Sequence, residues 1–326
     1  MCAVISSDLT ITYPARRSRG ALNLQPPHIT YPRNDAGDAV FGPGSFLYES
    51  YGDRRGYLVA PVEGLLQLMY FALGRGVEQH SAFYDEPLQR LIRSVPQIQG
   101  TIFDGRSAAE TAHPIRDFHR DIKGTMADGT RYHGLDPETY FWAHATFIDA
   151  AFRTSDLYFA RPYSREEKAA IYREGVRWWQ MYGLSARVVP GTYPEFHEYW
   201  EHTLHTVLEP TPAARGLVEF FRSPGSMPQP WIPNRLWRMA GPAGSQAWLK
   251  LGAGALPSIV REMFDIPWTR ANQVAFDAFR TTVAYTWPAI PYPLRIMPRA
   301  RVAYRRDGRL GLATARKLAA SARTAA

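Results

Sequence analysis

The 326-residue sequence contains a single cysteine, Cys2. One thiol excludes an intrachain disulfide framework and any cysteine-rich zinc or iron-sulfur site. This composition is typical of the reducing cytosol, so we expect a cytoplasmic protein. The sequence also lacks an apolar run of about 18 residues, the length that crosses a bilayer. At its start the basic residues, beginning with Arg16, follow the short apolar patch, which is the reverse of a secretory signal.

Strand-like alternation is scarce, and no linker rich in proline, serine or glycine divides the chain. We therefore predict an all-α fold with one large helical domain at 41–300. An extended or disordered arm at 1–40 precedes it, and a basic tail at 301–326 follows. Nine Trp, 18 Tyr and 16 Phe supply enough aromatic surface to line an apolar pocket.

The net charge of +8 comes mainly from arginines near the two ends. Basic ends are commonly solvated, and no helix-turn-helix or zinc-finger pattern accompanies them. We therefore expect no specific nucleic-acid partner. Weak peripheral contact with an anionic membrane would suit a protein with a lipid-like substrate.

Caps and periodicity predict helices along most of the chain. Pro87 opens one helix, and Ser107 opens another that bends near Pro114 and ends at Gly124. Asp136 is the expected N-cap of a helix to about residue 158. Two capping boxes, Ser164/Glu167 and Thr192/Glu195, open two more helices. Further helices are predicted at 62–73, 212–222, 230–240, 256–265 and 268–286, with turns at 101–106 and 127–130.

His119 shares a helix face with Ile115 and Ile122, so its imidazole is predicted to point inward. Two interpretations follow. The ring is either a core histidine satisfied by a backbone carbonyl, or a ligand to a buried metal or haem iron. A lone histidine carries no metal-ligand spacing, so the residue alone does not decide between them.

Other candidate ligands have simpler explanations. His144 and Asp149 lie on an apolar helix, so both are expected to be buried with partners. Glu198, His202 and His205 share a helix face at spacings that suit a metal, but no matching motif occurs on another helix. A solvated polar face explains these three residues equally well.

Several motifs together resemble the family of MpaB-type oxygenases and rubber oxygenase catalytic domains, which includes the latex-clearing proteins. The resemblance spans about residues 40–300. It is carried, in order, by Gly42-Pro43, LLQLMY at 65–70, EQHSAFYDEPLQRLIRS at 78–94, the His119 helix, GTRYHGLDPETYFWAHAT at 129–146, YREGVRWWQMYGLS at 172–185 and PGTYPEFHEYW at 190–200.

The resemblance implies a globin-like helical core around haem b, with His119 as the proximal iron ligand. The family's Arg-x-x-Lys-Thr group, on a helix across the haem, corresponds to Arg90, Arg93 and Ser94, although periodicity alone places that face in water. Arg90 would pair with a carboxylate such as a haem propionate. Arg93 replaces a lysine, and an arginine cannot lose its proton to ligate iron. It would instead donate hydrogen bonds towards the reacting oxygen.

Tyr132, His144 and Asp128 are expected to support the cofactor from a distance. The implied activity is oxygenation, by dioxygen, of an apolar substrate, in the family an isoprenoid alkene that is cleaved to carbonyl products. Two alternatives remain at this stage. One is a haem protein that carries or senses without turnover. The other is a non-haem helical protein in which His119 is merely buried.

Overall fold

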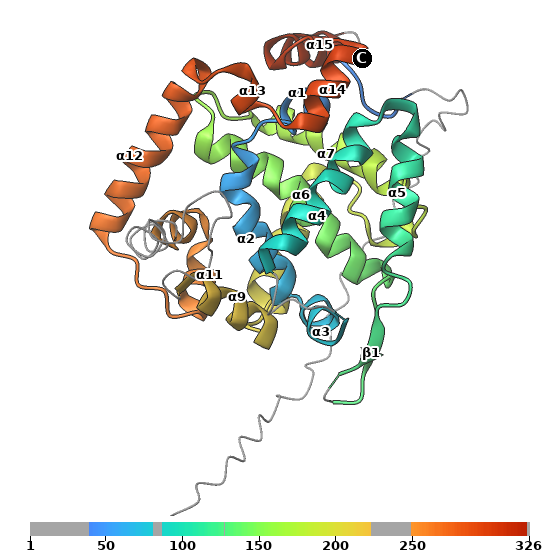
Figure 1. Ribbon diagram of the computed structural model, residues 1–326, viewed down its shortest axis with the longest axis vertical. Helices are drawn as coiled ribbons and strands as arrows, with labels where there is room; N and C mark the ends of the chain where they lie inside the picture. Colours follow the sequence, from blue (N-terminus) through green and yellow to red (C-terminus); the bar gives the residue numbers. More distant parts are fainter. Residues whose placement is uncertain (1–38, 81–86, 127, 223–248, 325–326) are drawn as a thin grey trace, which may run out of the picture.

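The fold is almost entirely helical in the computed structural model, which describes residues 39–80, 87–126, 128–222 and 249–324 (Figure 1). The prediction of an all-α protein is therefore confirmed, whereas the globin-like core stays a prediction. One two-stranded sheet interrupts the helices within the described ranges. The predicted helix at 230–240 lies outside them. The longer helices are α2 (Gly56–Met69), α3 (Phe71–His80), α4 (Pro87–Phe103), α5 (Ala108–Asp117), α6 (Pro137–Tyr158), α7 (Arg165–Gln180), α8 (Tyr193–His202), α9 (Pro212–Arg222), α12 (Arg270–Thr286), α14 (Pro298–Asp307) and α15 (Leu312–Thr324).

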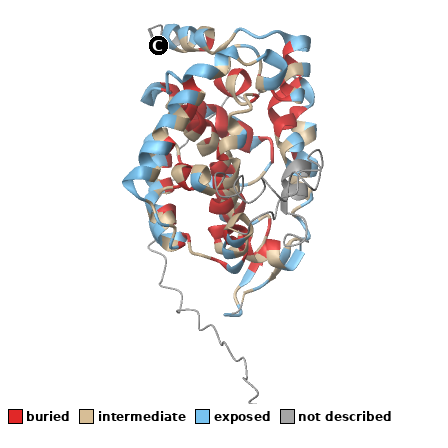
Figure 2. Ribbon diagram, turned by 60° about the vertical axis from the view of Figure 1, so that its left-hand side comes forward, coloured by how far each residue is buried: buried red, intermediate tan, exposed pale blue. Residues whose placement is uncertain are grey.

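Helix α6 runs through the centre of the molecule and contacts α2, α7 and α12. Asp136 caps it as predicted, because one carboxylate oxygen accepts from the backbone N–H groups of Glu138 and Thr139, each at 3.1 Å. Its body is apolar on most sides, and the buried residues in Figure 2 accordingly cluster in the middle of the molecule. The other helices form a shell around this axis.

Residues 62–73 do not form the single helix that the apolar run predicted. Helix α2 ends at Met69 and α3 leaves it at 95° after Tyr70, whose backbone is extended. The carbonyls at this break bond to a distant segment instead, since Met69 accepts from Glu209 N–H at 3.1 Å and Leu68 accepts from the Thr211 hydroxyl at 2.7 Å. The last carbonyls of α2 are therefore satisfied by hydrogen bonds from a segment far away in the sequence.

No single helix in the described ranges is long and apolar enough to cross a membrane, although the bent α2–α3 pair passes that test on length and composition.

A buried carboxylate fixes the start of the described chain. Helix α1 (Phe46–Ser50) presents its first backbone N–H groups to Glu174 of α7, at 2.9 Å from Phe46 and 2.8 Å from Leu47. Burial raises the pKa of Glu174 to about 7. Helix α7 itself begins with the predicted Ser164/Glu167 capping box, but it ends at Gln180, two residues before the predicted Tyr182.

The basic segment after residue 300 is helical and packs on the body of the protein. Helix α14 contacts α4, and α15 contacts α1 and α7. Several of its arginines form ion pairs, among them Arg309 with Glu49 and Arg316 with Glu167. The predicted limits of the arm, domain and tail stay predictions, and residues 1–38 lie outside the described ranges.

A buried ionic cluster joins three segments at the core. Arg153 of α6 donates to Glu63 of α2 at 3.0 Å, to Asp149 at 2.6 Å and to the carbonyl of Ala255 at 3.1 Å. Burial raises the pKa of Glu63 well above its usual range, and one of its carboxylate oxygens is buried without a hydrogen-bond partner among the described residues. The guanidinium is thus the cation that keeps the buried Glu63 and the half-buried Asp149 compatible with the core.

Replacing Arg153 by Met should therefore destabilise the protein by about 3–5 kcal/mol, because Glu63 and Asp149 would keep their burial without their cation. Chemical denaturation measures this change. The triple variant E63Q/D149N/R153M removes the charges together and should recover most of the lost stability. If R153M unfolds at the wild-type midpoint, the cluster does not stabilise the core.

Candidate functional site

His119 lies in the turn that follows α5, and not within a helix that continues to Gly124. Helix α5 ends at Asp117, and Gly124 belongs to strand β1 (Lys123–Thr125). The chain tightens after Pro114, since His119 N–H bonds to the carbonyl of Arg116 at 2.9 Å. Pro114 lacks the N–H of the regular ladder and weakens the helix here. The ring is half-buried at this point, not fully enclosed.

The hydrogen bond of His119 assigns its tautomer. Nδ1 lies 2.7 Å from the carbonyl oxygen of Ile115. A carbonyl only accepts, so in the neutral ring Nδ1 carries the proton and the lone pair lies on Nε2. Histidines that ligate metals commonly donate their other ring N–H in this way. The backbone carbonyl expected for a core histidine is present, and it leaves Nε2 in the chemical form that binds iron.

A β-hairpin follows the His119 turn and contacts it at the base of its two strands. Strand β1 pairs antiparallel with β2 (Arg131–His133), and Gly129 at φ 84° supplies the predicted Asp-Gly turn. The carbonyl of Ile122 accepts from Gly134 N–H at 2.6 Å. A Cβ on Gly134 would lie 2.8 Å from the carbonyl oxygen of His119. Only glycine allows this close approach without displacing the backbone.

The hairpin places the two predicted support residues differently. Tyr132 is buried in β2 and its hydroxyl is hydrogen-bonded to the Gln79 side chain at 2.5 Å. Burial raises its pKa. Asp128 is exposed in the turn and accepts from Thr130 N–H at 2.9 Å. Tyr132 thus joins the hairpin to α3, whereas Asp128 shapes the turn.

Charged side chains of both signs flank the His119 turn. Asp117 pairs with Arg116 and with Arg120, at 2.8 Å in each case, and these bonds lower the pKa of its carboxyl. Arg116 also donates to the carbonyl of Tyr182 at 3.1 Å. This bond ties the end of α5 to the end of α7. Asp121 lies in the same turn, so across residues 116–121 the two arginines are balanced by two aspartates.

Aromatic rings connect His119 with the core. Tyr140 lies edge-on to His119 with ring centroids 5.4 Å apart, and it also contacts Tyr182 at 5.2 Å and Trp179 at 5.8 Å. Tyr182 contacts His144 at 5.8 Å. Such edge-on pairs hold their partners in fixed orientations. The imidazole of His119 therefore rests on a rigid aromatic wall on one side.

His144 is fully enclosed between α6 and α7, and the prediction of a buried residue with a partner is confirmed. Nε2 donates to the carbonyl of Gly175 at 2.9 Å, whereas Nδ1 is buried and has no hydrogen-bond partner within the described part of the chain. Burial lowers its pKa to about 4. The ring packs against Trp178 at 5.1 Å and Trp179 at 5.6 Å. It therefore acts as a neutral part of the core.

Arg90, Arg93 and Ser94 lie in the first turns of α4. The side chains of Arg90 and Arg93 are outside the described residues, and Ser94 is exposed. Helix α4 packs against α5, and only a short turn separates them. Ser94 is nine residues before the end of α4 at Phe103, and Asp117 is nine residues after the start of α5 at Ala108. Ser94 and the end of α5 are therefore equally far along the chain from the turn that joins the two helices.

The candidate metal face, with Glu198 and His202 on α8 and His205 in the turn after it, does not gather metal ligands. Glu198, His202 and His205 are all exposed, and His205 lies 3.5 Å from Glu201. The described residues contain no cluster of three or more histidine, cysteine or acidic side chains that could hold a metal ion. A haem iron needs only one protein ligand, so this finding bears on non-haem metals alone.

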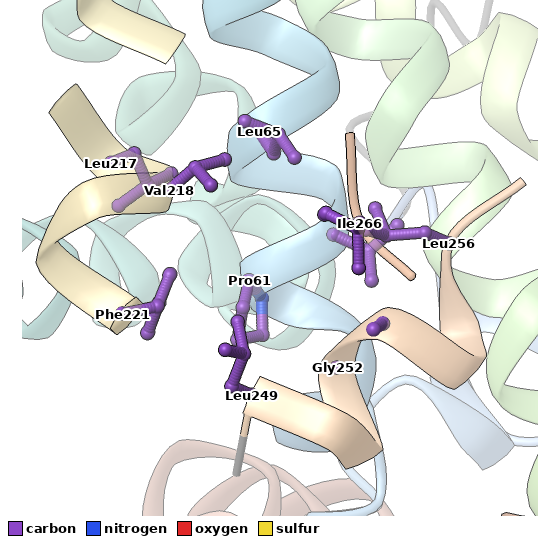
Figure 3. Close-up of a pocket in the computed structure, with 11 residues that line it drawn as sticks. Pro61, Leu65, Leu217, Val218, Phe221, Leu249, Gly252, Leu256 and Ile266 are labelled. Carbon is purple, nitrogen blue, oxygen red and sulfur yellow. The ribbon is translucent and has the colours of Figure 1, made fainter. Parts of the chain in front are cut away.

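One apolar pocket lies between α2, α9 and the helical segment at 249–255 (Figure 3). Its lining includes Pro61, Leu65, Phe221, Leu249 and Leu256, with no residue from α5 or the hairpin. Its cavity volume of about 40 Å³ is well below the roughly 150 Å³ of an engineered cavity that binds benzene. The pocket can hold a small apolar group, but it is far too small for a haem.

Two features of the structure, one in the core and one beside His119, were not predicted from the sequence. The cation of the buried cluster, Arg153, had a local signal in its i,i+4 spacing from Asp149 within an apolar helix. Tyr140, the ring beside His119, had no signal that distinguishes it from the other aromatic residues of α6. The contact depends on how α5 and α6 meet.

The fold and the site define an all-α protein with a half-buried histidine, His119, between the end of α5 and a β-hairpin. The family of the ER-bound oxygenase mpaB/B′ and rubber oxygenase catalytic domain matches residues 48–285. This match covers more than half of the 326 residues, and the chain belongs to that family. No curated protein and no solved structure matches the chain. The family is one of oxygenases, so the protein is assigned to enzymes of this type.

The neutral state of His144 predicts a pH dependence of stability. The pKa of His144 is about 4 in the folded protein and 6.5 in its ordinary state. Between these two pH values the imidazole is protonated in the unfolded chain and neutral in the folded one. Stability should therefore be fully present above pH 6.5 and fall as the pH drops towards 4, by up to about 3 kcal/mol.

Thermal unfolding of the wild type and of His144→Gln between pH 4 and 7 measures this dependence. The variant should lose less stability on acidification, because its side chain does not titrate. If the stability of the two proteins falls equally between pH 7 and pH 4, another titrating group causes the loss of stability in acid.

Proposed function

We propose that the protein is a haem b-dependent oxygenase in which His119 ligates the iron. The observation that carries the proposal is the hydrogen bond from His119 Nδ1 to Ile115, because it leaves the lone pair on Nε2. Family membership supplies the activity class. The donor chemistry at His119 fits a haem, which would supply the binding and activation of dioxygen.

The chain's own residues would orient and restrict this group. Ile115 holds the ring orientation through its carbonyl, and Tyr140 packs against the imidazole from the side. Arg116 and Arg120 lie next to His119 and would pair with the carboxylates of a haem in exchange for Asp117. The hairpin residue Tyr132 and the core residue His144 would support these elements without touching substrate.

The start of α4 is proposed to face the same cofactor. The contact between α4 and α5 supports this arrangement, because Arg90, Arg93 and Ser94 lie on the helix that packs against the one ending just before His119. Arg90 would pair with a carboxylate of the haem. Arg93, which stays protonated, would donate hydrogen bonds towards the reacting oxygen and would not ligate iron. The two helices would then form part of a globin-like core.

The substrate is proposed to be an apolar alkene of isoprenoid or lipid-like type. The support is the family and an interior rich in aromatic side chains. A water-poor environment around the iron would protect the reacting groups from competing hydrolysis. The polar groups near His119 are mostly engaged with each other, so recognition of the substrate would depend on shape and apolar contact.

An absorption spectrum of protein produced with added haem tests the proposal. The wild type should show a Soret band, and His119→Ala should lose it or bind haem at least about tenfold more weakly. His113→Ala is the matched control, because His113 is an exposed histidine on α5. A wild type without a Soret band, or an unchanged spectrum in His119→Ala, would refute the proposed ligand.

Oxygen consumption separates the proposed enzyme from a haem carrier or sensor. The haem-loaded wild type should consume dioxygen when an isoprenoid alkene is added, and Arg93→Ala should change both this rate and the ligand-binding spectrum. A normal Soret band without alkene-dependent oxygen uptake would favour the carrier or sensor. An unaltered ligand-binding spectrum in Arg93→Ala would count against the role of that arginine.

A further inference from the structure

An uncharged segment projects from the surface between α12 and α14. Residues 285–294 read YTWPAIPYPL and contain no ionisable side chain other than two tyrosines. Tyr285 is 69% exposed, Leu294 is 58% exposed and Tyr292 is 40% exposed. Large apolar side chains that are close together and exposed commonly mark a contact surface. We call this stretch the 285–294 segment.

The exposure of the 285–294 segment does not come from loose attachment. Directly after it, Ile296 and Met297 are buried, and the backbone is tied to the loop before α2. Arg54 N–H donates to the carbonyl of Arg295 and Met297 N–H donates to the carbonyl of Gly52, each at 2.8 Å. Figure 1 shows the intervening helix α13 (Tyr292–Arg295) between α12 and α14 at one end of the molecule. A fixed base therefore presents the apolar side chains to solvent.

Prolines make this segment suited to an apolar environment. Pro288, Pro291 and Pro293 have no backbone N–H, so three donors that would lose water on insertion are absent. An unsatisfied N–H in hydrocarbon is costly, and its removal lowers that cost. Tyrosine and tryptophan side chains favour the boundary between lipid and water, where the ring is apolar and the polar tip is wet.

Positive charge adjoins the apolar segment. Residues 287–309 contain six arginines and one aspartate, a net charge of +5 from 6 − 1. Some of the arginines are paired, such as Arg299 with Asp104. Arg301 and Arg305 share a face of α14 with the exposed Val302, and neither has a carboxylate partner within the described ranges. Arg305 is exposed, and Arg301 is half-buried with its Nε enclosed, so an external anion would reach Arg305 and the outer guanidinium nitrogens of Arg301.

We propose that the 285–294 segment and the arginine face of α14 dock the protein on an anionic lipid bilayer. The apolar side chains would enter the boundary of the bilayer while Arg301 and Arg305 contact lipid phosphates. A second copy of the chain is a poorer occupant, because a symmetric pairing would place the two positive faces against each other. The proposal is independent of haem and of substrate.

Vesicle co-sedimentation of the full chain tests the proposal. The wild type should bind vesicles of phosphatidylcholine with phosphatidylserine and should bind pure phosphatidylcholine much more weakly. The variant Y285S/L294S should reduce binding to the anionic vesicles about tenfold, because it removes the two most exposed apolar side chains of the segment. R301Q/R305Q should reduce binding to anionic vesicles by a similar factor without changing binding to neutral ones.

Val274→Ser provides the matched control, because Val274 is 62% exposed on α12 but lies outside the segment. It should bind vesicles like the wild type. Wild-type binding that is absent, equal on both lipid compositions, or unchanged in Y285S/L294S would overturn the proposal. A dimer in sedimentation velocity that dissociates in Y285S/L294S would instead assign this face to self-association.

Discussion

The central constraint of this structure is that helix α6 must bury nearly its whole circumference while carrying a charge. Its apolar sides require neighbours in every direction, and α2, α7 and α12 fill those positions. Arg153 then fixes how two of the surrounding segments sit, because its guanidinium bonds at the same time to Glu63 and to the carbonyl of Ala255. Shape alone would permit several helix arrangements, whereas these directional bonds select one.

The candidate site lies where this core meets less regular structure. The N-terminal half of α6 presents Tyr140 towards the end of α5, and the hairpin contacts the turn at Gly134. His119 is thus held by a rigid ring on one side and by its own backbone on another. Its half-buried position separates the proposed ligand from the fully enclosed His144, which stays neutral in the core. The two histidines have different chemistry because their surroundings differ.

The features that depend on nearby residues could be predicted from the sequence. The cap at Asp136, the two capping boxes and the turn at Gly129 all satisfy backbone groups a few residues away, and each is present. The inward direction of His144 followed from the apolar pattern of its helix. In these cases the chemical cause and its effect lie within one turn of chain.

The features that were mispredicted, or not foreseen, have causes far away in the sequence. The apolar run at 62–73 contains no breaker at its bend, and the bonds that accompany the end of α2 come from Glu209 and Thr211. The helix at His119 ends at Asp117 because a proline weakens it and a hairpin follows, although Gly124 is the stronger local stop signal. Glu174 caps a helix more than a hundred residues before it. No periodicity reveals such a partner.

The contacts of Glu49 show that the unit that folds is longer than the part shared with the family. Its buried carboxylate accepts from the N–H groups of Leu310 and Gly311, at 3.0 and 2.8 Å, and pairs with Arg309. The family match ends at residue 285. A fragment cut at that boundary would keep the acid in α1 and lose all three of these donors. The helices beyond the shared region thus complete the protein's interior. A version of the protein shortened to residue 285 would need another hydrogen-bond partner for the carboxylate of Glu49.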